Sequence, residues 1–344
     1  MEFRQLGQTD IKVSTLCLGT MTWGEQNTEQ EAFQQLDCAV DYGVNFIDTA
    51  ELYPTPAREA TYTATETIIG NWLKRRGHHR GLVIASKICG PGYDYMNGGR
   101  LMTPQHIHHA VEGSLKRLGV DCIDLFQLHW PDRNTNFFGQ LGYSTPPETD
   151  GTPIEITLEA LNDLVQAGKI RHYGLSNETP WGAMKHLNTS REKQQTRPVS
   201  IQNPYNLLNR SFEVGLAEIS HREQLGLLAY SPLAFGTLTG KYLNGQNPAN
   251  ARLTRFKKFT RYTSSPQSLK ATEAYVNLAR DSGLDPAQMA IAYVTSRFFV
   301  TSVIIGATHP EQLNSNLRSS ELSLSSDVLE AIEHIHQQYP NPAP

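Results

Sequence analysis

Four side chains that can take part in acid–base chemistry follow short apolar segments of the chain. Asp48 and Tyr53 follow VNFI at 44–47, Lys87 follows LVIAS at 82–86, and His129 follows IDLFQL at 123–128. A phenol has an unperturbed pKa of about 10, which makes it a poor acid at neutral pH. A buried ammonium beside the phenol favours the phenolate and lowers this pKa. We therefore expect Lys87 to lower the pKa of Tyr53.

Asp48 and His129 complete a set that could reduce a carbonyl group. A buried lysine tends to lose its proton unless a negative charge compensates it, and Asp48 can supply that charge. His129 can donate a hydrogen bond to a carbonyl oxygen. The set can polarise a carbonyl and give it a proton, but it contains no source of hydride. A cofactor must therefore supply the hydride.

Short apolar segments alternate with amphipathic helical segments along most of the chain. Helical spacing or helix start and stop signals mark residues 29–43, 103–119, 154–170 and 285–297; Thr103 and Pro104 begin the second of these and Gly119 ends it. The predicted strands are residues 15–18, 45–47, 82–86, 123–128, 171–174, 200–203, 227–230 and 302–305.

This alternation predicts a single α/β domain over residues 1–344, a (β/α)8 TIM barrel. Residues 3–6 and 11–13 are expected to form an N-terminal β-hairpin that closes the bottom of the barrel. The four titratable side chains would then meet at the C-terminal ends of neighbouring strands, where barrels of this type carry their chemistry. A doubly wound open sheet is the alternative, which the absence of GxGxxG after the first strand disfavours.

Composition excludes several other classes of protein. The net charge of -4 and the pI of about 6.3 give no sign of a nucleic-acid partner. No apolar stretch approaches the ~18 residues of a membrane span, and MEFRQLGQTD has no signal-peptide character. The four cysteines, Cys17, Cys38, Cys89 and Cys122, show no metal-ligand spacing and fit a cytoplasmic protein. Two long irregular segments, 131–153 and 234–266, are expected to be functional loops at the C-terminal face.

A series of motifs, taken in order, resembles the aldo-keto reductases over nearly the full length of the chain. The motifs are GTMTWG at 19–24, DTAELY at 48–53, ASK at 85–87, LHWP at 128–131, GKIRHYGLSN at 168–177, IQNPYN at 201–206, AYSPLAFGTLTGKY at 229–242 and IIGATHPEQLNSN at 304–316. LLNRSFEVGLAE, GTLTGKYLNG, the FTRY run and the terminal YPNPAP resemble the bacterial Tas-type reductases within that family.

The resemblance implies NADPH-dependent reduction of an aldehyde or ketone to an alcohol, without a metal. Tyr53 matches the general acid of the family, with Asp48, Lys87 and His129 around it. The cofactor, NADPH or NADP+, would contact these groups of residues: Thr20, Met21 and Asp48 near the nicotinamide ribose; Ser176, Asn177 and Gln202 at the carboxamide; Tyr230 stacked on the ring; Ser231, Pro232, Leu233, Ala234, Phe235, Gly236, Thr237, Leu238, Thr239, Gly240 and Lys241 around the pyrophosphate; and Gly306, Thr308, Gln312 and Asn316 at the adenosine.

The chain departs from the family pattern at the expected 2′-phosphate site. Residues 306–316 contain no lysine or arginine, and Gln312 stands in the place of the usual arginine. A basic cluster in the second long loop could supply the missing charge, with Arg252 as the first candidate. The cluster consists of Arg252, Arg255, Lys257, Lys258 and Arg261.

The substrate is expected to be a small carbonyl compound with aromatic or aliphatic bulk. The residues expected to line its pocket are Trp23, Trp130, Phe137, Phe138 and Tyr143. Two other functions stay open: an NADP(H)-binding sensor or partner subunit with little turnover, and a lyase that forms a Schiff base on Lys87. Asp48 argues against the lyase, because it should keep Lys87 protonated. The sequence carries no signal for an oligomeric state.

Overall fold

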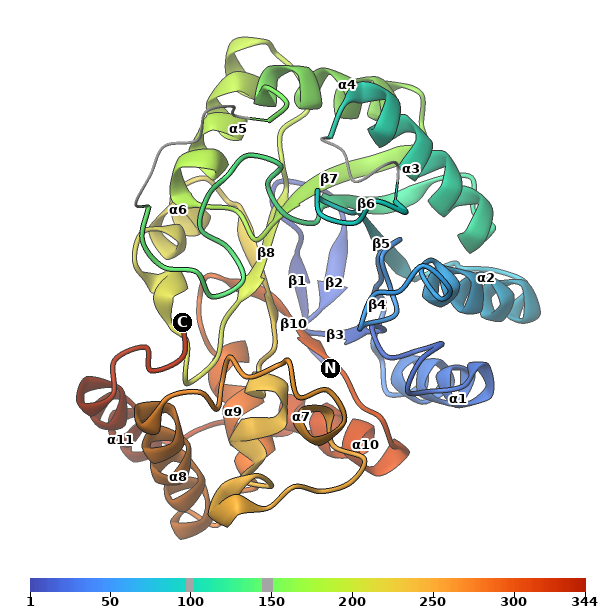
Figure 1. Ribbon diagram of the computed structural model, residues 1–344. Coiled ribbons are helices and arrows are strands. Elements are labelled where there is room, and N and C mark those ends of the chain that lie inside the picture. The colour runs from blue at the N-terminus through green and yellow to red at the C-terminus, as the bar shows by residue number, and fades with distance from the viewer. Residues whose placement is uncertain (97–101, 144–150) are drawn as a thin grey trace.

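The strands form a closed parallel barrel (Figure 1). The structure, a computed structural model, describes residues 1–96, 102–143 and 151–344. The strands follow one another around the barrel in the order β10-β3-β4-β5-β6-β7-β8-β9. Their bounds are β3 (Leu16–Gly19), β4 (Phe46–Asp48), β5 (Val83–Ile88), β6 (Ile123–Leu128), β7 (Ile170–Ser176), β8 (Ser200–Pro204), β9 (Gly226–Tyr230) and β10 (Val300–Ile305). The predicted barrel is confirmed, and the open-sheet alternative is wrong.

Helices surround the barrel on its outer side (Figure 1). They are α1 (Glu29–Asp41), α2 (Ala64–Arg76), α3 (Pro104–Leu118), α4 (Ile154–Gln166), α5 (Pro180–Glu192), α6 (Leu216–Arg222), α8 (Pro266–Asp281), α9 (Pro286–Thr295), α10 (Pro310–Arg318) and α11 (Ser326–Gln338). α3 shows how the sequence sets these bounds. The Thr103 side chain accepts a hydrogen bond from the N–H of His106, Pro104 occupies the first turn, and Gly119 ends the helix at φ 68°.

The N-terminal hairpin closes the bottom of the barrel, as predicted. Its strands, β1 (Phe3–Gln5) and β2 (Lys12–Ser14), pair antiparallel. The N–H of Ser14 donates to Oδ1 of Asn45 over 2.7 Å, directly before β4. Arg4 donates to the carbonyl of Val300, the first residue of β10. Both contacts lie at the N-terminal ends of barrel strands, opposite the face expected to carry the chemistry.

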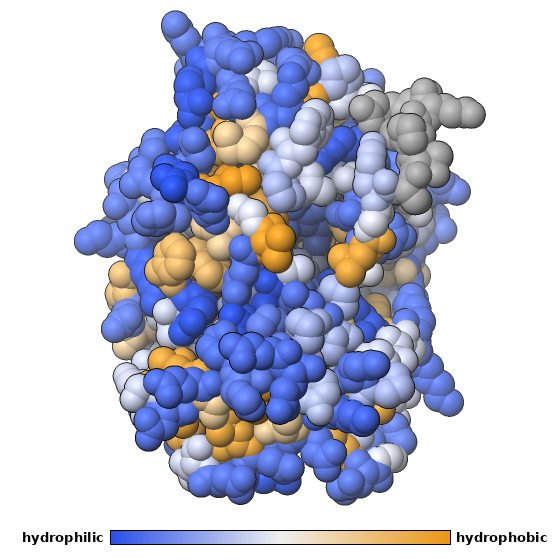
Figure 2. Space-filling view, turned by 90° about the vertical axis from the view of Figure 1, so that its left-hand side faces the viewer, coloured by the Kyte–Doolittle hydropathy of each residue, from blue (hydrophilic) through white to orange (hydrophobic). Residues whose placement is uncertain are grey.

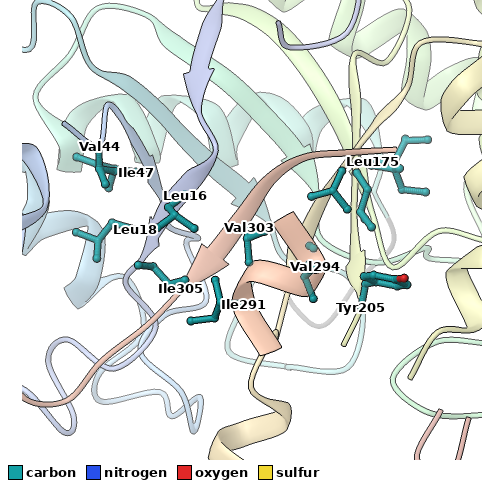
Figure 3. Packing of buried hydrophobic residues seen from close by; sticks show 14 of the residues in the cluster. Leu16, Leu18, Val44, Ile47, Leu175, Tyr205, Ile291, Val294, Val303 and Ile305 are labelled. Atoms are coloured by element: carbon teal, nitrogen blue, oxygen red, sulfur yellow. The ribbon is translucent and has the colours of Figure 1, made fainter. Parts of the chain in front are cut away.

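The barrel strands separate two apolar clusters by simple alternation. On the outer side, Val303 and Ile305 of β10 lie beside Ile291 and Val294 of α9 (Figure 3). Residues at the alternate positions belong to a second buried cluster together with the hairpin, and so fill the barrel interior. Its strand members include Cys17, Phe46, Val83, Ala85, Leu125, Leu228 and Ile304.

Polar residues take the inward positions one step further along the strands. Two residues after Phe46, Ala85, Leu125 and Leu228 come Asp48, Lys87, Gln127 and Tyr230. Since successive side chains of a strand point to opposite faces, each of these polar side chains also faces the barrel interior. The interior is therefore apolar near the hairpin and polar at the C-terminal ends of the strands.

The second long loop has more structure than the sequence predicted. Between β9 and α8 the chain forms two short 3-10 helices, η3 (Ala234–Thr239) and η4 (Leu243–Gly245), and one short α-helix, α7 (Arg252–Arg255). α7 packs against η3. Of the first long loop, 131–153, residues 144–150 lie outside the described part of the chain.

On the left-hand side of the molecule as seen in Figure 1, apolar residues form small groups among hydrophilic ones (Figure 2). The four cysteines are free thiols. Among the described residues, no helix has the length and apolar character needed to cross a membrane.

Candidate active site

Lys87 and Asp48 form a buried ion pair at the mouth of the barrel. Nζ of Lys87 lies 2.6 Å from Oδ2 of Asp48, and their side chains are 0% and 3% exposed. The same ammonium donates to the main-chain carbonyl of Thr49 over 2.8 Å. β4 and β5 are adjacent parallel strands, with Asp48 opposite Ala85, and this register brings the two side chains together.

Two amides hold the other oxygen of Asp48. Nε2 of Gln127 donates to Oδ1 over 3.0 Å, and Nε2 of Gln202 donates to the same atom over 2.9 Å. The hydroxyl of Thr20 donates to the main-chain carbonyl of Asp48 over 2.9 Å. The carboxylate is thus fixed from three strands besides its own. Sequence reasoning missed Gln127, although a polar residue at an inward position of a buried strand was a usable signal.

Tyr53 lies beside this pair and beside His129. Nζ of Lys87 is 5.0 Å from the centre of the Tyr53 ring, and the rings of Tyr53 and His129 meet edge-on at 5.7 Å. The N–H of Tyr53 donates to the carbonyl of Ala50, so a tight turn after β4 carries the phenol. The structure therefore brings together all four titratable residues that the sequence predicted to meet.

The pKa of Tyr53 does not follow the prediction. Burial raises the pKa of this phenol above its usual value of 10, and the opposing effect of Lys87 is smaller. The expectation of a lowered pKa was wrong because it counted the nearby ammonium and left out the loss of hydration. The phenol thus keeps its proton at neutral pH, as a general acid must.

The protonation states of Lys87 and His129 follow from their surroundings. Burial lowers the pKa of Lys87, but Asp48 and Tyr53 raise it by more, so the lysine stays an ammonium ion. Burial and the charge of Lys87 hold the pKa of His129 well below 6.5, so its imidazole is neutral. Nδ1 of His129 is buried and has no hydrogen-bond partner among the described residues. The neutral imidazole lies edge-on to the Tyr53 ring.

The residues expected around a carboxamide form one network at the ends of β7, β8 and β9. Asn177 donates to the carbonyl of His129 over 2.8 Å and to the Ser176 hydroxyl over 3.1 Å. The Tyr230 hydroxyl donates to Oδ1 of Asn177 over 2.7 Å. The Gln202 side chain instead donates to Asp48, and its main-chain carbonyl accepts from the Ser176 hydroxyl over 2.9 Å. These amide and hydroxyl groups line one side of the mouth, next to His129.

Lys241 and Arg252 bring two positive charges together beside η3. The ammonium of Lys241 lies over Gly236, where an added Cβ would come within 2.8 Å of Nζ, and the Arg252 guanidinium lies 5.3 Å from the centre of the Phe235 ring. Burial, and then the charge of Arg252, lower the pKa of Lys241. Neither residue forms an ion pair within the described ranges. Two partly buried cations without a carboxylate partner form a site suited to a phosphate group.

Of the residues expected at the adenosine end, Gly306 and Thr308 lie between β10 and α10, and Gln312 and Asn316 lie in α10. Thr308 donates from both its N–H and its hydroxyl to Oε1 of Gln312, over 3.1 and 3.2 Å. Asn316 donates to the carbonyl of Gly306 over 3.2 Å. Met21 follows β3, and its carbonyl accepts a hydrogen bond from the N–H of Thr55.

The aromatic residues expected in the substrate pocket separate into two groups. Trp130 packs against His129 and Phe138 at ring distances of 5.0 and 5.4 Å, and Phe137 contacts Phe138. Phe138 and Tyr143 are 48% and 61% exposed. These positions are consistent with a pocket wall near His129 for Trp130 and the two phenylalanines.

Trp23 is a correction to the predicted pocket. Its side chain is fully buried in the outer apolar cluster, and its indole N–H donates to Gln35 of α1 over 3.2 Å. Since α1 covers it, the indole offers no surface to a substrate. An aromatic residue after the first strand was wrongly taken as facing the mouth.

Comparisons with known proteins agree with this architecture. The model of the aldo/keto reductase family matches residues 15–337. The protein named Protein tas from Escherichia coli (strain K12) is 52% identical over the full length of both chains. The uncharacterized oxidoreductase YrpG of Bacillus subtilis (strain 168) is 32% identical, covering 99% of this chain and 97% of its own. A probable voltage-gated potassium channel subunit beta of Arabidopsis thaliana is 31% identical, covering 99% of this chain and 98% of its own.

Proposed function

The chain belongs to the aldo/keto reductase family of oxidoreductases, and from this premise we propose that it reduces aldehydes or ketones to alcohols with NADPH. The observation that carries the proposal is the buried Lys87–Asp48 pair beside Tyr53, whose ring meets the neutral imidazole of His129 edge-on. Such a set can hold a carbonyl oxygen and protonate it. A binding site without chemistry would have no need of a buried ammonium beside a phenol.

The bound cofactor would supply a hydride to the carbonyl carbon, and side chains of the protein hold and protonate the carbonyl oxygen. His129, neutral at physiological pH, donates a hydrogen bond to the carbonyl oxygen. The phenol of Tyr53 gives its proton to that oxygen as negative charge develops there. The nearby Lys87 ammonium lowers the energy of the phenolate that remains, and Asp48 keeps Lys87 charged. Solvent then returns a proton to Tyr53.

The residues at the mouth fit a pyridine dinucleotide phosphate. Amide and hydroxyl groups of Ser176 and Asn177 can pair with a carboxamide, and the Tyr230 ring is placed next to them. Lys241 and Arg252 offer positive charge to phosphates. We assign Arg252 to the 2′-phosphate, because residues 306–316 supply no cation.

One alternative is a cofactor-binding subunit with little turnover. It draws on the relative named as a probable channel subunit, which covers nearly the whole chain. The presence of Asp48, Tyr53, Lys87 and His129 in one cluster favours the enzyme. The lyase alternative is disfavoured because Asp48 raises the pKa of Lys87, and a protonated lysine is a poor nucleophile.

NADPH oxidation against a broad panel of aromatic and aliphatic aldehydes and ketones tests the proposal. We expect steady oxidation with several members of the panel and formation of the matching alcohols. NADPH that binds, as shown by its fluorescence, but is not oxidised with any member would contradict the reductase and support the subunit. Borohydride trapping of a carbonyl substrate on Lys87 would support the lyase instead.

A further inference from the structure

The segment that carries Tyr53 stays attached to β5 for three residues after β4 ends. The N–H of Thr49 donates to the carbonyl of Ala85 over 2.9 Å, and the N–H of Glu51 donates to the carbonyl of Lys87 over 3.2 Å. Both bonds keep the register of the β4–β5 ladder, in which Asp48 faces Ala85. In a parallel ladder of this register, the next bond would run from the N–H of Cys89 to the main-chain carbonyl of Glu51.

The side chain of Glu51 accepts that bond in place of its main chain. The N–H of Cys89 donates to Oε1 of Glu51 over 2.6 Å. The main-chain carbonyl of Glu51 instead accepts the N–H of Thr63 over 2.8 Å, at the start of α2. The carboxyl group thus replaces a peptide carbonyl at the residue where the chain leaves the sheet. Two residues later, the turn closed by the Tyr53 N–H places the phenol over the mouth.

We propose that Glu51 is a positioning residue that fixes Tyr53 relative to Lys87 by bonding the end of β5 through its side chain. The inference rests on the proposed function, since it assigns Tyr53 the role of proton donor. Glu51 is 5% exposed, so its carboxyl group has no hydration to exchange for the bond to Cys89. Without that bond, the N–H of Cys89 loses its acceptor, and only the main-chain bonds of Thr49 and Glu51 still hold the segment that carries Tyr53 to β5.

The charges around Glu51 make its bond sensitive to pH. Burial raises the pKa of Glu51 to about 7, and the charge of Glu66 in α2 also raises it. The hydrogen bond from the N–H of Cys89 lowers this pKa, as does the charge of Arg117, which donates to Glu66. The thiol of Cys89 faces the same carboxyl group and has a raised pKa, so it stays neutral. A charged acceptor forms a shorter and stronger hydrogen bond than a neutral one. The contact therefore tightens as pH rises through about 7.

Glu51→Leu and Glu51→Gln test the proposal in the full-length protein with NADPH and an accepted carbonyl. Glu51→Leu keeps similar bulk without an acceptor, and we expect kcat to fall about tenfold to a hundredfold. The KM for NADPH should change by less than about threefold, and the isotope effect with 4-deuterated NADPH should rise as chemistry becomes slower. Glu51→Gln keeps an oxygen acceptor and should restore most of kcat. Because its amide does not titrate, its kcat should lack the part of the wild-type pH dependence between pH 6 and 8 that comes from Glu51.

Hydrogen exchange of the Cys89 amide provides a readout that needs no turnover. It should lose protection in Glu51→Leu and keep it in Glu51→Gln. Glu66→Gln is the matched control, because Glu66 is a buried glutamate that bonds Ser86 and Arg117 and has no bond to the segment carrying Tyr53. Because Glu66 raises the pKa of Glu51, this control is compared with the wild type at pH 8, where Glu51 is charged in both proteins, and its kcat should stay within about threefold of the wild type.

The outcomes separate the two proposals. A folded Glu51→Leu protein with wild-type kcat, isotope effect and Cys89 protection overturns the role of Glu51. An equal loss of kcat in Glu66→Gln also overturns it, because the effect would then come from buried charge in general. A wild-type protein that oxidises no NADPH contradicts the proposed function, while the exchange data still decide whether Glu51 holds the end of β5.

Discussion

The ammonium of Lys87 and the carboxylate of Asp48 are in direct contact over 2.6 Å, and neither is open to solvent. The attraction between the two charges offsets the loss of hydration on burial, together with the bond from Lys87 to the Thr49 carbonyl and the bonds from Gln127 and Gln202 to Asp48. This contact keeps a positive charge next to Tyr53 at neutral pH.

Replacing Asp48 by asparagine should leave the buried Lys87 without a counter-charge. We expect the free energy of unfolding at pH 7 to fall by about 3–5 kcal/mol, as when one member of a buried ion pair is removed. The raised pKa of Lys87 means that the pair stabilises the wild type fully below about pH 10.5 and that this contribution is lost as pH rises through the raised pKa. The loss in Asp48→Asn should therefore shrink at high pH, which urea unfolding at pH 7 and at a pH above the raised pKa of Lys87 can measure.

Asp10→Asn is a suitable control for that experiment. Asp10 also pairs with a cation, Arg171, but over 3.5 Å and with an 83% exposed side chain. Its removal should have little effect on the free energy of unfolding, as for other exposed pairs. Similar losses in Asp48→Asn and Asp10→Asn would contradict the account of the buried pair.

Glu51 should make the stability of the protein depend on pH. Its pKa is about 7 in the folded protein and near 4.5 when unfolded. The folded protein therefore holds the proton of Glu51 more tightly than the unfolded chain does. This proton binding stabilises the folded protein fully below about pH 4.5, and the contribution is lost as pH rises through about 7. Between pH 5 and 8, the free energy of unfolding of Glu51→Gln should thus rise relative to the wild type by about 2–3 kcal/mol. Paired urea titrations at both pH values measure this; a constant difference would count against a raised pKa.

Arg252→Ala should weaken NADPH binding more than NADH binding. If the guanidinium bonds the 2′-phosphate, its removal should raise the Kd for NADPH roughly tenfold to a hundredfold, as for hydrogen bonds to charged groups. The Kd for NADH should change little. Fluorescence titration with both cofactors measures the two effects.

Arg255→Ala and Lys258→Ala are the matched controls for Arg252. Both residues belong to the same basic cluster, and each lies over the aromatic ring that follows it, Phe256 or Phe259. Neither should select between the cofactors. Equal weakening of NADPH and NADH binding in Arg252→Ala would contradict the proposed 2′-phosphate contact. A selective loss of NADPH binding in one of the controls would assign that contact to Arg255 or Lys258 instead.

The fold and the four titratable residues could be predicted because their signals are local. Alternating apolar strands and capped helices indicate the barrel, and parallel strands bring their C-terminal ends to one face. Asp48, Lys87 and His129 each stand at or just beyond the end of an apolar strand. Their meeting with Tyr53 follows from the strand order β4-β5-β6.

The remaining features depend on contacts between distant segments. The raised pKa of Tyr53 depends on how completely other segments bury it, which residue types alone do not give. Trp23 was wrongly predicted to line the pocket because α1 packs over it, and the contact that shows this packing is with Gln35, twelve residues further along the chain. Glu51 was read only as part of a motif, since its bond to Cys89 appears only once β4 and β5 are in register.

The most direct test of the central claim is a single-turnover measurement of Tyr53→Phe with bound NADPH and a carbonyl substrate. The phenol is the proton donor in this account, so hydride transfer should slow by about a hundredfold or more. The Kd for NADPH should stay near the wild-type value, because Tyr53 is assigned no contact with the phosphates or the carboxamide. Hydride transfer at the wild-type rate in a folded Tyr53→Phe protein would contradict the account.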